Sequence, residues 1–131
     1  MNEFSLSLLR FINSLGLPMT ARLDYLSDSD DLVIYSTPGG RVVEAFMDGT
    51  KELSLPFEIA LKSRDQETGN AIMWMINEAL SQHDLDLSGN TEKYRFIDLT
   101  LSKPHLEGKD EQGYYLWLLT IETKLETGDE K

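Results

Sequence analysis

RVVEAFMDGTKELSLPFEIALKS, residues 41–63, is the most strongly patterned stretch of this chain. Large apolar residues occupy every second position from Leu53 to Leu61, and the polar residues Glu52, Ser54, Glu58 and Lys62 fall at the alternate positions. This two-residue period is typical of a strand with one face against a core. Asp48-Gly49 can supply the positive φ values of a two-residue type I′ turn. The stretch therefore predicts a long hairpin in which 41–47 folds back onto 50–63.

Helical patterns stand on both sides of this hairpin. Before it, apolar residues recur at helical spacing and are followed by Gly16 and Pro18, which predicts a helix over about Glu3–Leu15. After it, Ser63 and Gln66 have the spacing of a capping box, which predicts a second helix over about Asp65–Gln82. The apolar stripes that define the two helices are Phe4, Leu8, Phe11, Ile12 and Leu15 in the first, and Ile72, Met75, Ile76, Ala79 and Leu80 in the second.

Four further segments have strand-like composition. Ala21–Tyr25 and Leu32–Ser36 are expected to form a second hairpin, and Tyr94–Ser102 and Tyr114–Leu125 are the last two strands, joined by the polar loop Pro104–Gln112. The final strand has apolar residues on both faces in its first half, so it is expected to be central in the sheet. The order is helix, four strands, helix, two strands. This order predicts an α+β fold, a mostly antiparallel sheet with long hairpins packed by two helices.

Length and composition bound the domain organisation and the partners. The chain has 131 residues and is 40% hydrophobic, which suits a single domain over 1–125 followed by an acidic flexible tail, 126–131. Its 23 acidic against 12 basic residues give a net charge of -11, which disfavours direct DNA binding. The absence of cysteine excludes disulfides, thiolate zinc sites and a cysteine nucleophile. No apolar run is long enough to span a bilayer, so we expect no membrane association.

The residues that could carry chemistry do not form a recognisable centre. His83 and His105 lack metal-ligand spacing, and Asp28, Asp30 and Asp31 lack the glycine and distal glutamate of a calcium loop. No serine has the setting of a hydrolase nucleophile. Met73, Trp74 and Met75 on the second helix are interpreted as core residues rather than as a ligand pocket. We therefore expect no enzyme activity, no cofactor and no bound metal.

The first hairpin is instead a candidate protein interface. It offers strand edges, and it places aromatic and methionine side chains next to its turn. The alternative is that Phe46 and Met47 partly fill the inner face of the hairpin and need no partner. The candidate interface residues are Arg41, Glu44, Phe46, Met47, Asp48, Gly49 and Lys51.

Several segments, taken together, resemble one protein family. They are Leu15-Gly16-Leu17-Pro18, Pro38-Gly39-Gly40-Arg41-Val42, Met47-Asp48-Gly49-Thr50-Lys51-Glu52, Leu55-Pro56-Phe57-Glu58-Ile59-Ala60 and Asp110-Glu111-Gln112-Gly113-Tyr114-Tyr115. They resemble the minor capsid proteins of tailed phages and prophages, a family similar in size and layout to phage tail terminator, or tail completion, proteins. The resemblance covers about residues 8–125, and its motifs carry no catalytic residues.

This resemblance implies a non-enzymatic virion protein at the head-tail junction, folded in the cytoplasm of the bacterial host. Such a protein would form a ring, often a hexamer, that caps the tail tube, with the tube protein and the neck or head-completion proteins as partners. DNA would pass through the ring without specific binding. A negatively charged lumen would help by like-charge repulsion. The lumen candidates are Asp28, Asp30, Asp31, Glu107, Asp110 and Glu111.

Three other functions stay open at this point. One is a head-completion or neck protein, and another is a non-viral adaptor that binds a protein partner through the same hairpin. The third is a small-ligand binder or enzyme with a pocket between the second helix and the sheet. The ring stoichiometry, the neighbouring virion proteins and the choice between an active phage and a prophage remnant are left open by the sequence.

Overall fold

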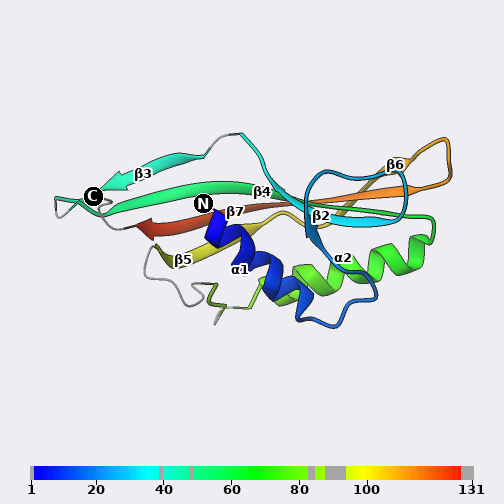
Figure 1. Ribbon diagram of the computed structural model, residues 1–131, viewed down its shortest axis with the longest axis horizontal. Helices are drawn as coiled ribbons and strands as arrows, with labels where there is room; N and C mark the ends of the chain where they lie inside the picture. The colour runs from blue at the N-terminus through cyan, green and yellow to red at the C-terminus, as the bar shows by residue number, and fades with distance from the viewer. Residues whose placement is uncertain (1, 39, 48, 83–84, 88–93, 128–131) are drawn as a thin grey trace.

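The computed structural model describes residues 2–38, 40–47, 49–82, 85–87 and 94–127 (Figure 1). Two helices and seven strands lie within these ranges, and the sheet is mostly antiparallel, which confirms the expected α+β class. In chain order the elements are α1 (Asn2–Asn13), β1 (Arg22–Leu23), β2 (Asp31–Ser36), β3 (Arg41–Ala45), β4 (Lys51–Ser63), α2 (Gln66–Leu80), β5 (Tyr94–Leu101), β6 (His105–Lys109) and β7 (Tyr115–Thr127).

Two long antiparallel strands form the centre of the sheet. β4 and β7 each contain 13 residues, and they pair without interruption from Lys51 opposite Thr127 to Ser63 opposite Tyr115. The expected central position of the final strand is therefore confirmed. Because every residue of β4 has a partner in β7, this pair fixes the register of the whole sheet.

Each outer edge of the central pair carries two shorter strands placed end to end. β3 pairs with residues 51–54 of β4 and β2 with residues 57–62 of the same strand. On the other edge, β5 pairs with residues 121–127 of β7 and β6 with residues 115–118. Figure 1 shows the result, an elongated sheet with the β3–β4 connection at one end and the β6–β7 connection at the other.

The 41–63 hairpin is confirmed, but its turn differs from the expected one. The amide of Phe46 donates to the carbonyl of Thr50 (2.9 Å), and the amide of Gly49 donates to the carbonyl of Phe46 (3.1 Å). Three residues therefore separate the closing pair, rather than two, and Gly49 adopts φ 92°. A three-residue loop with glycine in the left-handed region is the next commonest hairpin connection. Asp48 lies outside the described residues.

The second expected hairpin is wrong, because β1 and β2 are parallel. Arg22 pairs with Val33 and Leu23 with Ile34. The Arg22 guanidinium explains the geometry: it donates to Asp24 (2.7 Å) and to the carbonyl of Tyr25 (3.1 Å) in the loop, and to Asp31 at the start of β2. These bonds hold the loop in a wide turn that brings the chain back to the same end before β2 begins.

The segment Pro104–Gln112, expected to be a loop, contains the edge strand β6. It pairs with β7, with a bulge between Leu106 and Gly108, and all its residues but Gly108 are exposed. An edge strand that is exposed on both faces shows no alternation of apolar and polar residues, so its sequence gave no strand signal. β7 also runs two residues beyond the expected end at Leu125, to Thr127.

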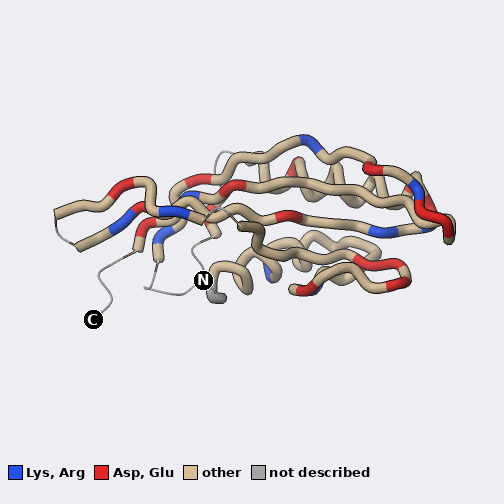
Figure 2. The backbone as a smooth tube through the Cα atoms, turned by 90° about the horizontal axis from the view of Figure 1, so that it is seen from above, with Lys and Arg blue, Asp and Glu red and all other residues tan. Residues whose placement is uncertain are grey.

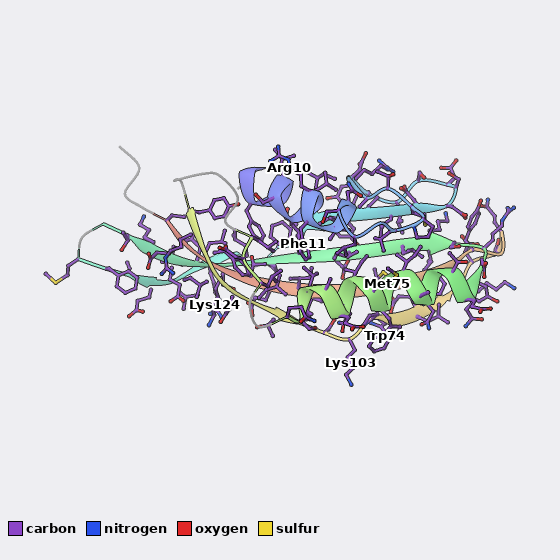
Figure 3. All side chains as sticks on the ribbon, turned by 90° about the horizontal axis from the view of Figure 1, so that it is seen from below. Arg10, Phe11, Trp74, Met75, Lys103 and Lys124 are labelled. Atoms are coloured by element: carbon purple, nitrogen blue, oxygen red, sulfur yellow. The ribbon has the colours of Figure 1, made fainter. Side chains whose placement is uncertain are left out.

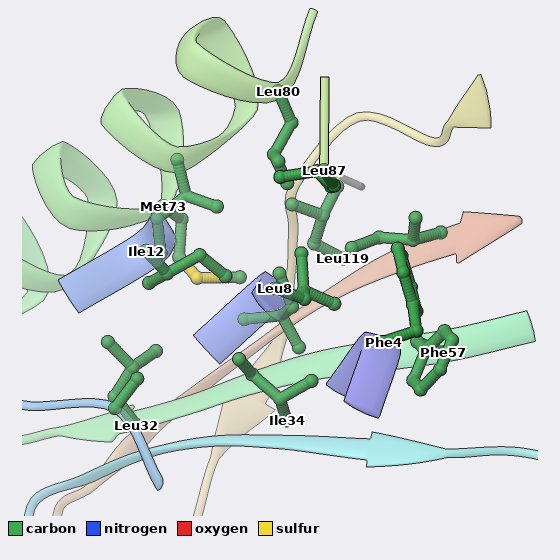
Figure 4. Packing of buried hydrophobic residues seen from close by; sticks show 14 of the residues in the cluster. Phe4, Leu8, Ile12, Leu32, Ile34, Phe57, Met73, Leu80, Leu87 and Leu119 are labelled. Atoms are coloured by element: carbon green, nitrogen blue, oxygen red, sulfur yellow. The ribbon is translucent and has the colours of Figure 1, made fainter. Parts of the chain in front are cut away.

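Both helices cover one face of the sheet, called here the covered face. The core lies between the helices and this face (Figures 3 and 4). Phe4, Leu8 and Ile12 of α1 pack with residues of α2 and with odd-numbered residues of β4 and β7. The even-numbered residues Glu52, Ser54, Glu58 and Lys62 of β4 lie on the opposite face, called the open face. The covered-face core includes Ile34, Phe57, Ile59, Leu61, Ile72, Met73, Ile76, Leu80, Trp117, Leu119, Ile121 and Leu125.

The expected capping box of α2 is not formed. The N-cap is Asp65, whose carboxylate accepts hydrogen bonds from the amides of Glu67 (3.1 Å) and Thr68 (3.3 Å). Ser63 instead accepts a hydrogen bond from the Asp65 amide (3.1 Å) and so shapes the turn before the helix. An aspartate at the N-cap satisfies free amides and also interacts favourably with the positive end of the helix dipole.

Candidate interaction surfaces

The tip of the β3–β4 hairpin is the most exposed apolar part of the described chain. The Met47 side chain is fully exposed, and Val42 (52%), Val43 (42%) and Phe46 (41%) are also accessible. All five residues of β3 are exposed, and Phe46 and Met47 follow directly after this strand. The exposure of Met47 argues against the alternative in which it fills an inner face, whereas the partial exposure of Phe46 is compatible with that alternative. Several exposed apolar side chains close together in an acidic chain are a feature of protein interaction sites.

The candidate interface residues fall together at this end. Arg41, Glu44 and Lys51 are exposed and flank the tip, and Gly49 is half-buried within the loop. Val42 and Val43 belong to the same surface, although nothing in the sequence pattern marks them as exposed. Valine in a strand usually indicates core, and only the position of β3, at an edge and beyond the reach of the helices, exposes both of them.

The acidic candidates of the lumen come together at the opposite end of the sheet. Lys62, near the end of β4, donates to the carbonyl of Ser27 (3.1 Å) and lies 3.8 Å from the Asp110 carboxylate. This one side chain therefore joins the loop before β2 to the loop before β7. Figure 2 shows acidic segments gathered at this end of the molecule.

Two of the six acidic candidates have clear structural roles. Asp31 is 6% exposed, forms an ion pair with Arg22 and accepts a hydrogen bond from the Ser27 amide (2.9 Å). The hydrogen bond from Arg22 lowers the pKa of Asp31 to about 2. Asp110 closes the β6–β7 turn by accepting hydrogen bonds from the amides of Tyr114 and Gln112 (both 2.9 Å), and its pKa is lowered, first by the Tyr114 bond.

The other four acidic candidates are exposed at the same end of the sheet. Asp28 and Asp30 lie in the loop before β2, Glu107 lies in β6, and Glu111 lies in the β6–β7 turn. Glu107 contacts His105 Nε2 at 2.8 Å, and both side chains are about half exposed. These four carboxylates, rather than Asp31, present negative charge to the surroundings.

The outward face of α2 corrects the interpretation of its methionine and tryptophan residues. Met73 is fully buried as expected, but Trp74 (43%) and Met75 (46%) are exposed, on the side of the helix away from the sheet (Figure 3). The helix packs on the sheet through Gly69, Ile72, Met73, Ile76 and Leu80. A single sheet beneath the helix cannot cover the rest of its apolar surface.

The hollow between α2 and the sheet is small. It lies where the end of α2 meets β5, has a volume of about 190 Å³ and is lined by Leu80, Ser81, Gln82, Leu85 and 96–99. Small-molecule sites commonly have volumes of about 300–1,000 Å³. This hollow therefore gives little support to the small-ligand alternative.

The Tyr35 hydroxyl, on the open face, hydrogen-bonds to Glu58 and has a perturbed pKa. Burial, followed by the hydrogen bond that it donates to Glu58, raises the pKa of the Tyr35 hydroxyl above its usual range.

Within the described ranges, no group of three or more histidine and acidic side chains is arranged to hold a metal ion. His83 lies outside those ranges. In the same part of the chain, neither helix has the length and apolarity needed to cross a membrane.

A family model and a solved structure are similar to this chain. A family model described as "Bacteriophage tail terminator protein" matches residues 10–127. A solved structure described as "Virion of native gene transfer agent (GTA) particle" is similar to this fold with a TM-score of 0.59 and 16% sequence identity, over 92% of this chain and 90% of that chain. No curated protein matches the sequence significantly.

Proposed function

This chain belongs to the bacteriophage tail terminator protein family, and we propose that it closes the end of a phage tail tube as a ring at the head-tail junction. The family match covers most of the chain, and it makes the protein a structural component of the phage tail. Membership also favours the tail side of the junction over the head-completion alternative, and a phage role over a non-viral adaptor.

The observation that carries the ring proposal is the separation of two different surfaces at the two ends of the sheet. An apolar tip surrounded by charged side chains lies at one end, and the acidic loops joined by Lys62 lie at the other. In a ring, the first surface would contact other proteins, and the second would face the channel. Strand edges favour contact between copies because they present unpaired backbone groups.

In the proposed hairpin contact, the apolar surface is formed by Val42, Val43, Phe46 and Met47. The charged residues around them determine which partner binds. Exposed methionine and aromatic residues are enriched at protein interfaces, where their burial releases water. The partners we propose are further copies of this chain, the tail tube protein and the neck proteins. This assignment keeps Arg41, Glu44, Lys51 and Gly49 at the contact.

The proposed lumen charge comes from Asp28, Asp30, Glu107 and Glu111, with Asp110 partly exposed behind them. Negative side chains repel the DNA phosphates within about one Debye length, roughly 8 Å at physiological salt. DNA that is repelled by the wall can slide without being held. A catalytic role forms no part of this proposal, and the proposed site of folding is the cytoplasm of the bacterial host.

The direct test is electron microscopy of phage particles that lack this protein. We expect tails of uncontrolled length, or full heads without attached tails. Restoring the protein from a plasmid should restore normal particles. Normal, infectious virions in its absence would refute the proposed role.

A second test addresses the lumen. Reversing Asp28, Asp30, Glu107 and Glu111 to lysine should leave assembly intact and slow DNA release, because the channel would then attract phosphates. The matched control reverses Glu78, an exposed acidic residue near the other end of α2, which we place away from the channel. Equal DNA release from both variants would contradict a negative lumen.

A further inference from the structure

Two rows of side chains, all charged except Ser54, cross the hairpin end of the sheet on its open face. The pairing of β3 with β4, of β4 with β7 and of β7 with β5 places one residue of each strand in each row. Both rows begin at the outer edge of β3 and end at the outer edge of β5. Among the described residues, no strand pairs with either of these outer edges.

The first row contains three adjacent carboxylates. Glu44 pairs with Glu52, Glu52 with Glu126, and Glu126 with Arg95. Arg95 forms an ion pair with Glu126 at 3.4 Å, so it compensates the β5 end of the row. At the β3 end, Glu44 stands exposed beside another glutamate. Like charges directly opposite one another destabilise a sheet, so this end of the row would gain from a cation.

The second row has the reverse polarity. Arg41 pairs with Ser54, Ser54 with Lys124, and Lys124 with Asp98. Here the β3 edge carries the cation and the β5 edge carries the carboxylate, and both terminal residues are exposed. The β3 edge therefore reads Arg41 then Glu44, and the β5 edge reads Asp98 then Arg95. The two edges of one molecule are complementary in charge at the same two levels of the sheet.

The strand directions allow these edges to meet. Three successive antiparallel pairings separate β3 from β5, so β3 of one copy and β5 of another are antiparallel when the sheet is continued from copy to copy. At equal level, Glu44 would face Arg95 of the next copy, and Arg41 would face Asp98. All four side chains lie on the open face, and the end of α2 meets β5 at 96–99, beside Asp98.

We propose that the β3 edge of one subunit lies along the β5 edge of a second copy of this chain, with ion pairs from Glu44 to Arg95 and from Arg41 to Asp98. This inference rests on the proposed ring and specifies its subunit contact. Each acidic triplet would then have an arginine at both ends. Such a contact joins two different surfaces, so it repeats from copy to copy and closes when the rotation between copies allows it.

Cysteine cross-linking tests the register, and the chain contains no cysteine of its own. Glu44→Cys protein is mixed with Arg95→Cys protein and oxidised, and Arg41→Cys is mixed with Asp98→Cys in the same way. Directly opposite residues in a sheet are close enough for a disulfide. The matched control mixes Glu44→Cys with Thr100→Cys, on the same strand and face as Arg95 but roughly 13 Å further along it. The same mixtures are oxidised in purified chain and in assembled particles.

We expect the two test pairs to cross-link at least tenfold faster than the control pair. The edge pairing would be overturned if the test and control pairs cross-linked at equal rates. It would also be overturned if the test pairs formed no cross-link in either the purified chain or the particles. Particles that assemble normally with the variant chains but do not cross-link would overturn only this contact. Normal virions without the chain would overturn the proposed function itself.

Charge exchange separates this contact from a role in folding. Glu44→Arg should weaken self-association or particle incorporation at least tenfold, and yet it should not lower the melting temperature, because it relieves repulsion from Glu52. Adding Arg95→Glu to the same chain should restore association. A loss of stability in Glu44→Arg without a loss of association, or a double variant as defective as the single ones, would contradict the proposed pairs.

Discussion

Gly69 of α2 lies against the six-membered ring of Trp117 in β7, so closely that a β-carbon at residue 69 would overlap the ring. The side chain of Leu61 closes the same contact from β4, 3.0 Å from the position of that β-carbon. Glycine in a helix interior costs about 1 kcal/mol relative to alanine. The close approach of the helix to the sheet is the structural reason for this residue.

Gly69→Ala is therefore expected to destabilise the fold despite the better helix propensity of alanine. Overpacking a tight core costs about 1–3 kcal/mol, which exceeds the gain in propensity. Chemical denaturation measures the difference. The control is Asn70→Ala on the exposed side of the same turn, which should be neutral or slightly stabilising. Equal behaviour of the two variants would show that the contact with Trp117 relaxes without cost.

Phe4→Ala should be among the most damaging substitutions in α1. Phe4 is fully buried, and its ring contacts Phe57, Tyr94 and Phe96, with centroids 5.5, 5.8 and 6.3 Å away. Removing a buried phenylalanine side chain costs about 3–5 kcal/mol. Leu6→Ala, on the exposed side of the helix, should cost less than about 1 kcal/mol. A small effect of Phe4→Ala on thermal unfolding would mean that α1 contributes little to the core.

Asp31 should make stability depend on pH in the acid range. Its pKa is about 2 in the folded protein, below the value of about 3.9 in an unfolded chain. The stabilisation is therefore complete above about pH 4 and is lost as the pH falls towards 2, a contribution of roughly 1–2 kcal/mol after solvent screening.

Asp31→Asn should lower stability at neutral pH and reduce the change in unfolding free energy between pH 5 and pH 2. Asp30→Asn, which removes an exposed carboxyl group from the same loop, is the control and should change stability by less than about 0.5 kcal/mol. If both variants followed the wild-type pH profile, the Arg22–Asp31 pair would have no net effect on folding.

Asp65 and Gln66 distinguish the observed cap from the expected one. Asp65→Ala removes the acceptor for two amides and should destabilise the protein by about 1 kcal/mol. Gln66→Ala should have almost no effect, because the capping box that would need its side chain is not formed. The reverse order of effects in urea denaturation would favour the capping box.

Lys62 should control the order of the acidic end. Its ammonium group reaches the Ser27 carbonyl and Asp110, and it also lies 4.8 Å from the centroid of the Tyr114 ring. Lys62→Met keeps the apolar stem and removes these interactions. Amide hydrogen exchange should become faster in both loops, 24–30 and 110–114, and should not change in α2. An effect on one loop alone would show that the lysine does not couple them.

Strands of the sheet could be predicted from the sequence where one face of the strand is buried. The alternation from Leu53 to Leu61 predicted a strand with one buried face, and the two-sided character of β7 predicted a central strand, because burial on a pleated strand has a period of two. The pairing of these two strands with each other was not predicted. The same rule explains the failure at β6. His105–Lys109 has solvent on both faces, so no period was present to detect.

Other differences between the predicted and the observed structure depend on single contacts, which a pattern of apolar and polar residues in the sequence does not reveal. The parallel arrangement of β1 and β2 depends on the three partners of Arg22, and the exposure of Trp74 and Met75 depends on which side of α2 meets the sheet. The candidate surfaces were predicted in part. The loops were identified from their charge, but their meeting at Lys62, and the complementary edges at Arg95 and Asp98, require the register between distant strands.

The uninterrupted pairing of β4 with β7 sets a fixed distance between the two ends of the sheet. Thirteen residues in extended conformation span roughly 40 Å, and the ladder cannot stretch without breaking its backbone bonds. The apolar tip and the acidic loops are consequently held at a constant spacing. Changing that spacing while keeping each side chain on its own face would require adding residues to both strands two at a time. The length of these two strands therefore determines the dimensions of any assembly built from this chain.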